Sequence, residues 1–246
     1  MERLVVTLFA VGLLFLTGCA VKGTPIFVLT TPQFVPQSQP DSAIEAGVGQ
    51  DPNTGGIFLQ WYTTESAAGY TIYRSDTMNS SGLPIDFSMI GKTTSATSLD
   101  DTVYIDGLAV RVGVRYYYFV RAYAADGSLS HPSDTLDYEL MQRPGPMYPA
   151  QNALVTGPGL YFQWADFAGG GLTVVRVKDI TELPSVFVWI SKRFQVYGAY
   201  PEILFDADGA ATGELISGHS YQWRVDRFIP GANEGARSTW QAFRVK

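Results

Sequence analysis

Apolar residues along the chain recur at every second position in short runs, and turn-forming residues separate these runs. Three clear examples are residues 57–61, 70–73 and 116–123, with Gly, Asp, Asn and Ser between them. Alternation with a period of two places successive side chains on opposite faces of a β-strand. No long window keeps the 3.6-residue period of an amphipathic helix together with helix caps. The pattern therefore predicts an all-β protein.

The N-terminus follows another pattern, because residues 4–16 are apolar apart from Thr7 and Gly12. Such a run fits a signal peptide and is shorter than the about 20 residues of a membrane-spanning helix. It ends in the sequence LTGC at 16–19, which resembles a bacterial lipobox, and Cys19 is the single cysteine. We therefore predict a lipoprotein signal peptide and lipid attachment at Cys19. The alternative is a buried cysteine behind an ordinary signal sequence.

The resemblance to a lipobox also predicts where the protein is held. It implies an exported protein that is anchored to the bacterial membrane by lipid on Cys19. The next residue is Ala20 and not Asp, which resembles lipoproteins that are sent to the outer membrane in bacteria with two membranes. Residues 19–35 contain Pro25 and Pro32 among Thr and Gln. Because proline favours extended, solvated backbone, we predict a lipidated tether there. The apolar residues 26–29 leave open a short strand that docks part of this tether.

The rest of the chain is a tandem duplication, because three blocks of sequence occur twice in the same order. The matched pairs are GIFLQW at 56–61 and GLYFQW at 159–164, GYTIYR at 69–74 and GLTVVR at 171–176, and VxxGxxYxYxV at 110–120 and LxxGxxYxWxV at 215–225. Trp61 precedes Tyr116 by 55 residues, and Trp164 precedes Tyr221 by 57 residues. The similar spacing favours two copies of one domain.

Each copy resembles a fibronectin type III domain, which is a β-sandwich of about 100 residues. The resemblance implies that Trp61 and Trp164 pack in the two cores, and that Tyr116 and Tyr221 close tyrosine corners. Immunoglobulin-like domains share this architecture, so we predict two tandem fibronectin type III or immunoglobulin-like β-sandwiches. The predicted organisation is a signal peptide at 1–18, a tether at 19–35, domain 1 at 36–141, a linker at 142–147 and domain 2 at 148–246.

Composition narrows the possible functions. The chain has 246 residues with 17 Lys+Arg against 23 Asp+Glu, which gives a formal net charge of −6. It therefore lacks the basic surface that nucleic-acid binding needs. One cysteine excludes an internal disulfide and a cysteine-based zinc site, and two histidines are too few for a histidine-rich metal site. The 13 % of aromatic residues is explained mostly by the cores of two sandwiches without disulfides.

Residue patterns of known catalytic sites are absent from the sequence. It contains no G-x-S-x-G, G-x-G-x-x-G or phosphate-loop pattern, and His131 and His219 lie in expected turns. We therefore predict no catalytic residue, no cofactor and no enzyme. Asp206, Asp208 and Glu214 are weak candidates for a calcium site, because oxygen ligands flank a turn glycine there. An Asp-Gly hairpin turn explains the same residues equally well, and no metal is our prediction.

An unusual aromatic segment lies between the second and third matched blocks of the second copy. Residues 186–190 read VFVWI, and Tyr197 and Tyr200 follow. A strand of a sandwich normally has one polar face, so this strand is either covered by another part of the chain or exposed for binding. In the second case Trp189, Tyr197 and Tyr200 would form an aromatic platform for a protein partner or a glycan.

These observations predict a non-catalytic, membrane-anchored envelope lipoprotein that acts as a protein-binding, adhesion or scaffold module. Its expected partners are the membrane, through the lipid on Cys19, and another envelope protein. A carbohydrate-binding surface lipoprotein that uses an aromatic patch around Trp189 is the alternative.

Overall fold

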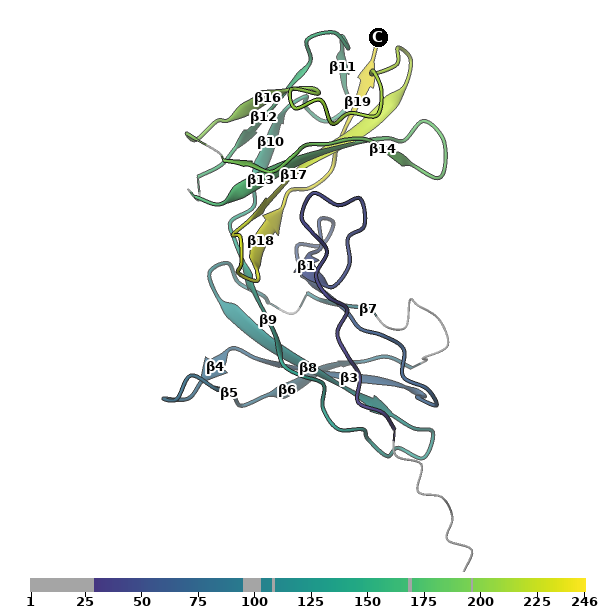
Figure 1. The fold of residues 1–246 in the computed structure, drawn as a ribbon, viewed down its shortest axis with the longest axis vertical. Helices are drawn as coiled ribbons and strands as arrows, with labels where there is room; N and C mark the ends of the chain where they lie inside the picture. Colours follow the sequence, from purple (N-terminus) through teal and green to yellow (C-terminus); the bar gives the residue numbers. More distant parts are fainter. Residues whose placement is uncertain (1–28, 95–102, 108, 168–169, 196) are drawn as a thin grey trace, which may run out of the picture.

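A computed structural model shows two lobes stacked along the long axis of the molecule (Figure 1). It describes residues 29–94, 103–107, 109–167, 170–195 and 197–246. The predicted signal peptide, Cys19 and the first part of the predicted tether lie outside these residues. The described residues form strands, turns and loops, and no helix among them could span a membrane. The predicted all-β fold is confirmed.

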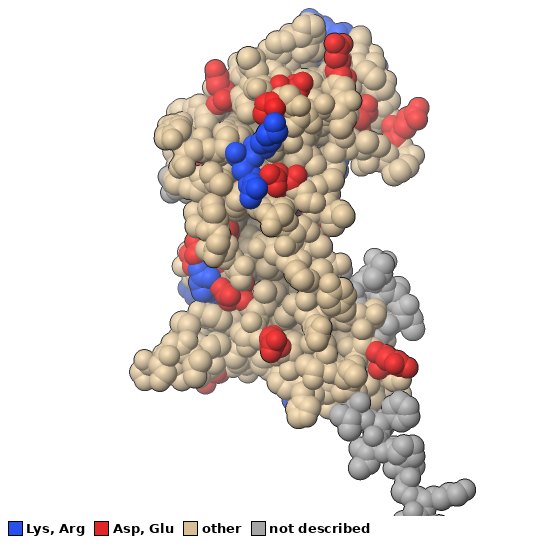
Figure 2. All heavy atoms as spheres, in the orientation of Figure 1, with Lys and Arg blue, Asp and Glu red and all other residues tan. Residues whose placement is uncertain are grey.

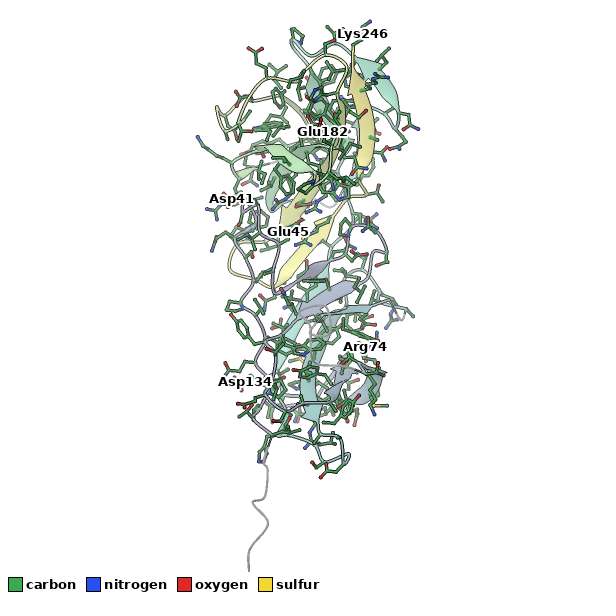
Figure 3. All side chains as sticks on the ribbon, turned by 90° about the vertical axis from the view of Figure 1, so that its right-hand side faces the viewer. Asp41, Glu45, Arg74, Asp134, Glu182 and Lys246 are labelled. Atoms are coloured by element: carbon green, nitrogen blue, oxygen red, sulfur yellow. The ribbon has the colours of Figure 1, made fainter. Side chains whose placement is uncertain are left out.

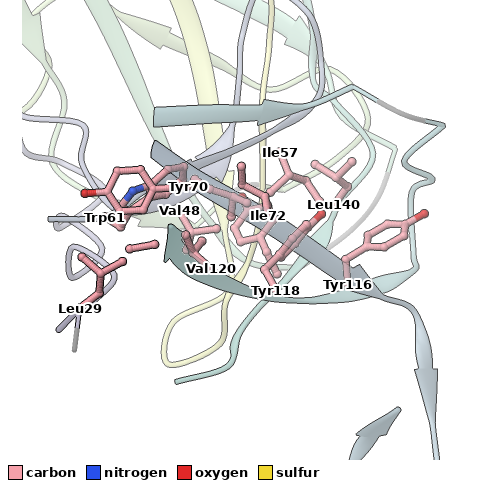
Figure 4. Packing of buried hydrophobic residues seen from close by; sticks show 13 residues of the cluster. Leu29, Val48, Ile57, Trp61, Tyr70, Ile72, Tyr116, Tyr118, Val120 and Leu140 are labelled. Atoms are coloured by element: carbon pink, nitrogen blue, oxygen red, sulfur yellow. The ribbon is translucent and has the colours of Figure 1, made fainter. Parts of the chain in front are cut away.

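The first lobe is a sandwich of two antiparallel sheets with the strand orders β1-β2-β7 and β6-β3-β8-β9. The strands are β1 (Val48–Gln50), β2 (Ile57–Gln60), β3 (Gly69–Ser75), β6 (Ser88–Lys92), β7 (Val103–Asp106), β8 (Arg115–Tyr123) and β9 (Leu136–Leu140), with a small hairpin of β4 (Thr77–Met78) and β5 (Pro84–Ile85). Strand β8 alternates as its sequence predicts, because Tyr116, Tyr118 and Val120 are buried between half-buried neighbours. Figure 4 shows these side chains in the core of the first lobe.

The second lobe repeats this arrangement, with one sheet ordered β10-β12-β16 and a second sheet built around β14-β13-β17. The strands are β10 (Gly145–Tyr148), β11 (Ala153–Val155), β12 (Tyr161–Ala165), β13 (Leu172–Asp179), β14 (Val186–Ile190), β15 (Phe194–Gln195), β16 (Glu202–Leu204), β17 (Ser220–Phe228), β18 (Glu234–Arg237) and β19 (Gln241–Val245). Strand β10 begins inside the segment 142–147 that the sequence analysis treats as a linker. Phe162, Trp164 and Trp223 are fully buried in the core.

Both lobes contain the tyrosine corner that the resemblance implies. The backbone N–H of Arg111 donates a hydrogen bond to the hydroxyl of Tyr116 at 3.0 Å. The backbone N–H of Ile216 donates in the same way to Tyr221 at 2.8 Å. In each corner the glycine three residues before the tyrosine has a positive φ, 73° and 87°, a conformation that a side chain would strain.

The two lobes share one sheet. Strand β9 of the first lobe lies parallel to β18 of the second lobe, with Glu139 opposite Glu234. The backbone N–H of Glu139 donates to Asn233 O, and the N–H of Met141 donates to Gly235 O, both at 2.9 Å. A continuous sheet therefore runs from β6 through β9 and β18 to β17, and the sequence pattern did not predict this pairing.

The C-terminal part of the predicted tether, from residue 29 on, packs against the first lobe. Leu29 is 6 % exposed and belongs to the core of the first lobe. The backbone N–H of Val35 donates to Gln60 O at 3.0 Å, beside strand β2. Prolines favour extended backbone, but extended backbone can pair with a sheet edge as well as lie in water. Residues 29–35 of the predicted tether are thus docked on the first lobe, the alternative that the apolar residues 26–29 left open.

One of the three matched blocks is out of register by a residue. Val120 on β8 and Val225 on β17 are equivalent in the tyrosine motif. Ile72 lies opposite Val120, but Val175 lies opposite Val225, although the matched blocks pair Ile72 with Val174. A slip of one residue moves every side chain of a strand to the other face. Arg74 consequently points into the core of its lobe, whereas Arg176 lies on the outer face of its sheet.

Candidate functional site

Strand β14 supplies core side chains, and it does not form an exposed platform. Trp189 is 1 % exposed, and its ring lies beside Phe162 and Phe205 with centroid distances of 5.8 and 5.4 Å. Its Nε1 donates a hydrogen bond to Asp208 at 2.9 Å. The prediction that Trp189 belongs to a binding surface is therefore wrong. The loop after β16 covers this strand, as its hydrogen bond from Thr212 N–H back to β14 shows.

The other two residues of the predicted platform are exposed. Tyr197 is 81 % exposed and Tyr200 is 57 % exposed. Phe167, in the loop after β12, is 69 % exposed, and its ring meets that of Tyr200 edge-on at 5.7 Å. We call Phe167, Tyr197 and Tyr200 the aromatic patch. Clustered exposed rings are typical of interaction surfaces.

The backbone joins the two loops of the aromatic patch, because the N–H of Asp166 donates to Ala199 O at 2.8 Å. Phe167 was not predicted from the sequence, because it follows GLYFQW at 159–164 outside any alternating run. The signal that could have found it is a large aromatic residue inside a turn rich in glycine.

Two of the three calcium candidates, Asp206 and Asp208, accept hydrogen bonds from neighbouring groups of the protein. The carboxylate of Asp208 accepts hydrogen bonds from Trp189 Nε1 and from the backbone N–H groups of Lys192 and Ala210. Burial opposes ionisation of Asp208, but these hydrogen bonds outweigh it and hold the pKa of the carboxyl below its usual value. Asp206 accepts from a backbone N–H within the same turn. Among the described residues, no group of three His, Cys, Asp or Glu could hold a metal ion.

Glu214, the third calcium candidate, is exposed beside Phe205 and Leu215. Asp206 accepts a hydrogen bond from within its own turn, whereas Asp208 also accepts hydrogen bonds from Trp189 and Lys192 outside the turn.

A charge network lies where the second lobe faces the first. Arg176 on β13 and Arg224 on β17 are direct cross-strand partners, and both side chains are at most 2 % exposed. Asp226 accepts a hydrogen bond from Nε of Arg176 at 2.7 Å and from Nε of Arg224 at 2.8 Å. The carboxylate of Glu45, from the first lobe, accepts from Arg224. Arg237 also pairs with Glu45 at 3.5 Å, so three positive and two negative charges meet between the lobes. Figure 3 shows Glu45 there.

Aromatic rings flank this network on the outer face of the second lobe. The guanidinium of Arg224 lies 4.6 Å from the ring centre of Trp240, and that of Arg176 lies 5.6 Å from Phe187. Lys178 lies over the same tryptophan at 4.2 Å. Cation–π contacts of this kind stabilise a cation that has lost part of its water.

A second ion cluster also joins the two lobes. Arg115 on β8 forms ion pairs with Asp137 and Glu139 of its own lobe and with Glu234 of the second lobe. These side chains are about one third exposed. Partly exposed pairs contribute little energy singly, so we assign the orientation of the lobes to the buried network and the shared sheet.

Two glycines allow the lobes to approach closely. A Cβ on Gly235 would lie 2.8 Å from the hydroxyl of Tyr138 and 2.8 Å from Arg227 O. A Cβ on Gly49 would lie 2.9 Å from Nη2 of Arg237. Because real Cβ contacts are longer, side chains at these positions would push the lobes or the strands apart.

Surface charges are mixed on the face that Figure 2 shows, where Lys and Arg side chains lie beside Asp and Glu side chains. The charge network escaped the sequence analysis, although charged residues inside the apolar runs VVRVK and YQWRVDR signal it. A charge in a buried strand needs a partner, and only the fold shows which residue provides it.

Comparison with known proteins gives no assignment by sequence. No family model matches the chain, and no curated protein matches it. One similar solved structure is a fibronectin type III-like protein from Clostridium thermocellum, with 19 % identity and a TM-score of 0.32, covering 45 % of this chain and 91 % of that one. Another contains the FN1–FN3 domains of chicken CNTN1, with 13 % identity and a TM-score of 0.28, covering 88 % of this chain and 66 % of that one.

Proposed function

We propose that this chain is a non-catalytic lipoprotein of the bacterial envelope, held to the membrane by lipid on Cys19, that binds another envelope protein through its folded part. The observation that carries the proposal is the sequence LTGC at 16–19 directly after the apolar run 4–16. Each CH₂ of an acyl chain that enters the bilayer contributes about 0.8 kcal/mol, so several chains on one cysteine hold a protein firmly.

The stretch of chain between the proposed lipid on Cys19 and the first folded residue is short. Leu29 already packs in the first core, so nine residues separate it from Cys19. Fully extended, these residues span at most about 30 Å. The described part of the chain begins at one end of the first lobe, and the C-terminus lies at the opposite end of the molecule (Figure 1). The second lobe, with its aromatic patch, would thus lie on the side away from the anchor.

Labelling of the full-length protein with radioactive palmitate tests the anchor. We expect the wild type and Ala20→Ser to incorporate the label and Cys19→Ala to lose it, because the acyl chains require the cysteine sulfur. Label in Cys19→Ala, or none in the wild type, would refute lipidation at this site.

The aromatic patch is the surface that we assign to the protein partner. We expect an envelope protein to co-purify with the wild type and to be lost from Tyr200→Ala, since aromatic residues dominate the binding energy of many interfaces. Tyr62→Ala is the matched control, because Tyr62 is 54 % exposed on the first lobe. Equal recovery of the partner with both variants would remove the patch from the proposal.

Carbohydrate binding is the second candidate, favoured by the exposed rings of Phe167 and Tyr200. Burial of Trp189 removes the residue on which this alternative first depended, so it now rests on the aromatic patch alone. Sedimentation with insoluble cell-wall polysaccharides, using the same two tyrosine variants, separates it from protein binding. Polysaccharide binding that survives in Tyr200→Ala would exclude the patch as a glycan site.

A further inference from the structure

Two arginines of the second lobe contact the first lobe, and both are buried in the whole molecule. Arg176 and Arg224 lie directly opposite each other on β13 and β17, and like charges in such pairs repel. Within the second lobe both guanidiniums form ion pairs with one carboxylate, that of Asp226. In the whole molecule both guanidiniums are buried, so they have lost most of their water and need acceptors beyond Asp226.

The first lobe supplies what is missing through residues 38–46, which we call the strap. The carbonyl oxygens of Pro40 and Ser42 accept hydrogen bonds from Arg176, and Glu45 accepts from Arg224. Glu45 brings a second carboxylate to the network, where Arg237 also pairs with it at 3.5 Å, and the guanidinium hydrogens of Arg176 and Arg224 gain acceptors. The strap thus completes the buried network of the other lobe.

The strap is itself fixed in the first lobe. Its ends are joined by a hydrogen bond from Ser38 N–H to Ala46 O at 3.1 Å and by one from Ala46 N–H to the hydroxyl of Ser38 at 3.0 Å. The side-chain oxygen of Gln60, on β2, accepts from the N–H of Gly47 at 3.2 Å. Figure 1 shows this closed loop reaching from the first lobe toward the sheet of the second. A loop closed at its base presents its carbonyl groups in a defined place.

We propose that the strap makes folding of the second lobe depend on the first, so that the two sandwiches unfold as one cooperative unit. Tandem sandwiches joined by a plain linker would unfold independently. Here the two arginines keep their acceptors on the strap only while both lobes are folded, so unfolding of either lobe removes contacts of the other. The proposal goes beyond membrane anchoring and partner binding, and it holds whether or not Cys19 is lipidated.

Hydrogen exchange of the full-length protein in increasing urea tests this dependence, because mass spectrometry of peptides reports each lobe separately. In the wild type we expect peptides from β2 and β8 and peptides from β12 and β17 to lose protection at the same urea concentration. Glu45→Ala should lower the midpoint of the β12 and β17 peptides by about 1 M, the lower end of the cost of removing one partner of a buried ion pair, because Glu45 itself is 23 % exposed. Ile44→Ala is the control, because Ile44 is 71 % exposed in the same loop.

Two results would overturn the proposal. One is separate midpoints for the two lobes in the wild type. The other is a midpoint in Glu45→Ala that differs from the wild type no more than that of Ile44→Ala. If Glu45→Ala fails to fold, Glu45→Gln serves in its place, because the amide keeps one acceptor oxygen and removes only the charge. We expect it to lower the same midpoint by a smaller amount than the alanine variant, and an unchanged midpoint would again contradict the role of the strap.

Discussion

Replacing Asp106 with alanine should destabilise the first lobe strongly. Asp106 is fully buried at the end of β7, and its two oxygens accept hydrogen bonds from Nη1 of Arg74 at 3.1 and 2.8 Å. The hydroxyl of Tyr118 donates to the same carboxylate at 2.9 Å. This group therefore joins the two sheets of the sandwich inside its core.

The expected magnitude follows from these contacts. Removing one partner of a buried ion pair costs about 3–5 kcal/mol. The side chain of Arg74 is 21 % exposed, so part of its charge can reach water, and we expect the lower end, about 3 kcal/mol. Loss of the acceptor for Tyr118 adds about 1 kcal/mol. With a urea dependence of about 2–3 kcal/mol per M, the midpoint should fall by roughly 1–2 M.

Urea unfolding followed by far-ultraviolet circular dichroism measures this shift. Asp76→Ala is the matched control, because Asp76 pairs with Arg111 at 3.8 Å and both side chains are exposed. Such a pair contributes about 0–1 kcal/mol. A midpoint for Asp106→Ala within 0.3 M (roughly 1 kcal/mol) of that control would refute the reasoning.

Three further predictions concern the joint and the corners. The pKa of Asp226 lies below the usual value of 3.8, because Arg224 and Arg176 outweigh the opposing effect of burial. The ionised carboxylate therefore stabilises the folded protein above pH 3.8, and this contribution is lost as the pH falls through the folded-state pKa. The urea midpoint should drop in that range, and it should drop less in Asp226→Asn. Gly235→Ala should cost about 1–3 kcal/mol in a urea titration, since its Cβ would lie 2.8 Å from the hydroxyl of Tyr138, whereas Gly213→Ala should cost little, because its Cβ meets nothing within 4 Å. Tyr116→Phe should lower the melting temperature by the equivalent of about 1 kcal/mol, because the N–H of Arg111 loses its acceptor. An Asp226→Asn variant with the wild-type acid response, a harmless Gly235→Ala or an unchanged Tyr116→Phe would each contradict the contact on which it rests.

Local patterns were sufficient for the strands and for the corners. Alternation in β8 places Tyr116, Tyr118 and Val120 in the core because a strand has only two faces. The corner tyrosines follow from a spacing of a few residues, within which the chain closes its own hydrogen bond. Such features depend on neighbours in sequence, so the sequence carries them directly.

The aromatic segment shows where this reasoning fails. Apolar residues on both faces of 186–190 indicated that the strand is either covered by another segment or exposed for binding. The sequence pattern is the same in both cases. Trp189 is buried because a loop some twenty residues later folds over it and Asp208 accepts its N–H. Tyr197 and Tyr200 stay exposed in the same part of the chain. The hydrophobicity of a residue does not tell which distant segment will cover it.

The sequence by itself determined strand type, the duplication and the two corners, and it supplied the LTGC sequence on which the proposed anchor rests. Only the tertiary structure decided the faces of Arg74 and Arg176, which match in the repeat but differ by one residue in register. It also decided that Glu45 meets Arg224, 179 positions away. The physical reason is the range of the interactions. Alternation and turns are short-range, whereas the neutralisation of a buried charge depends on whichever segment the whole fold brings beside it.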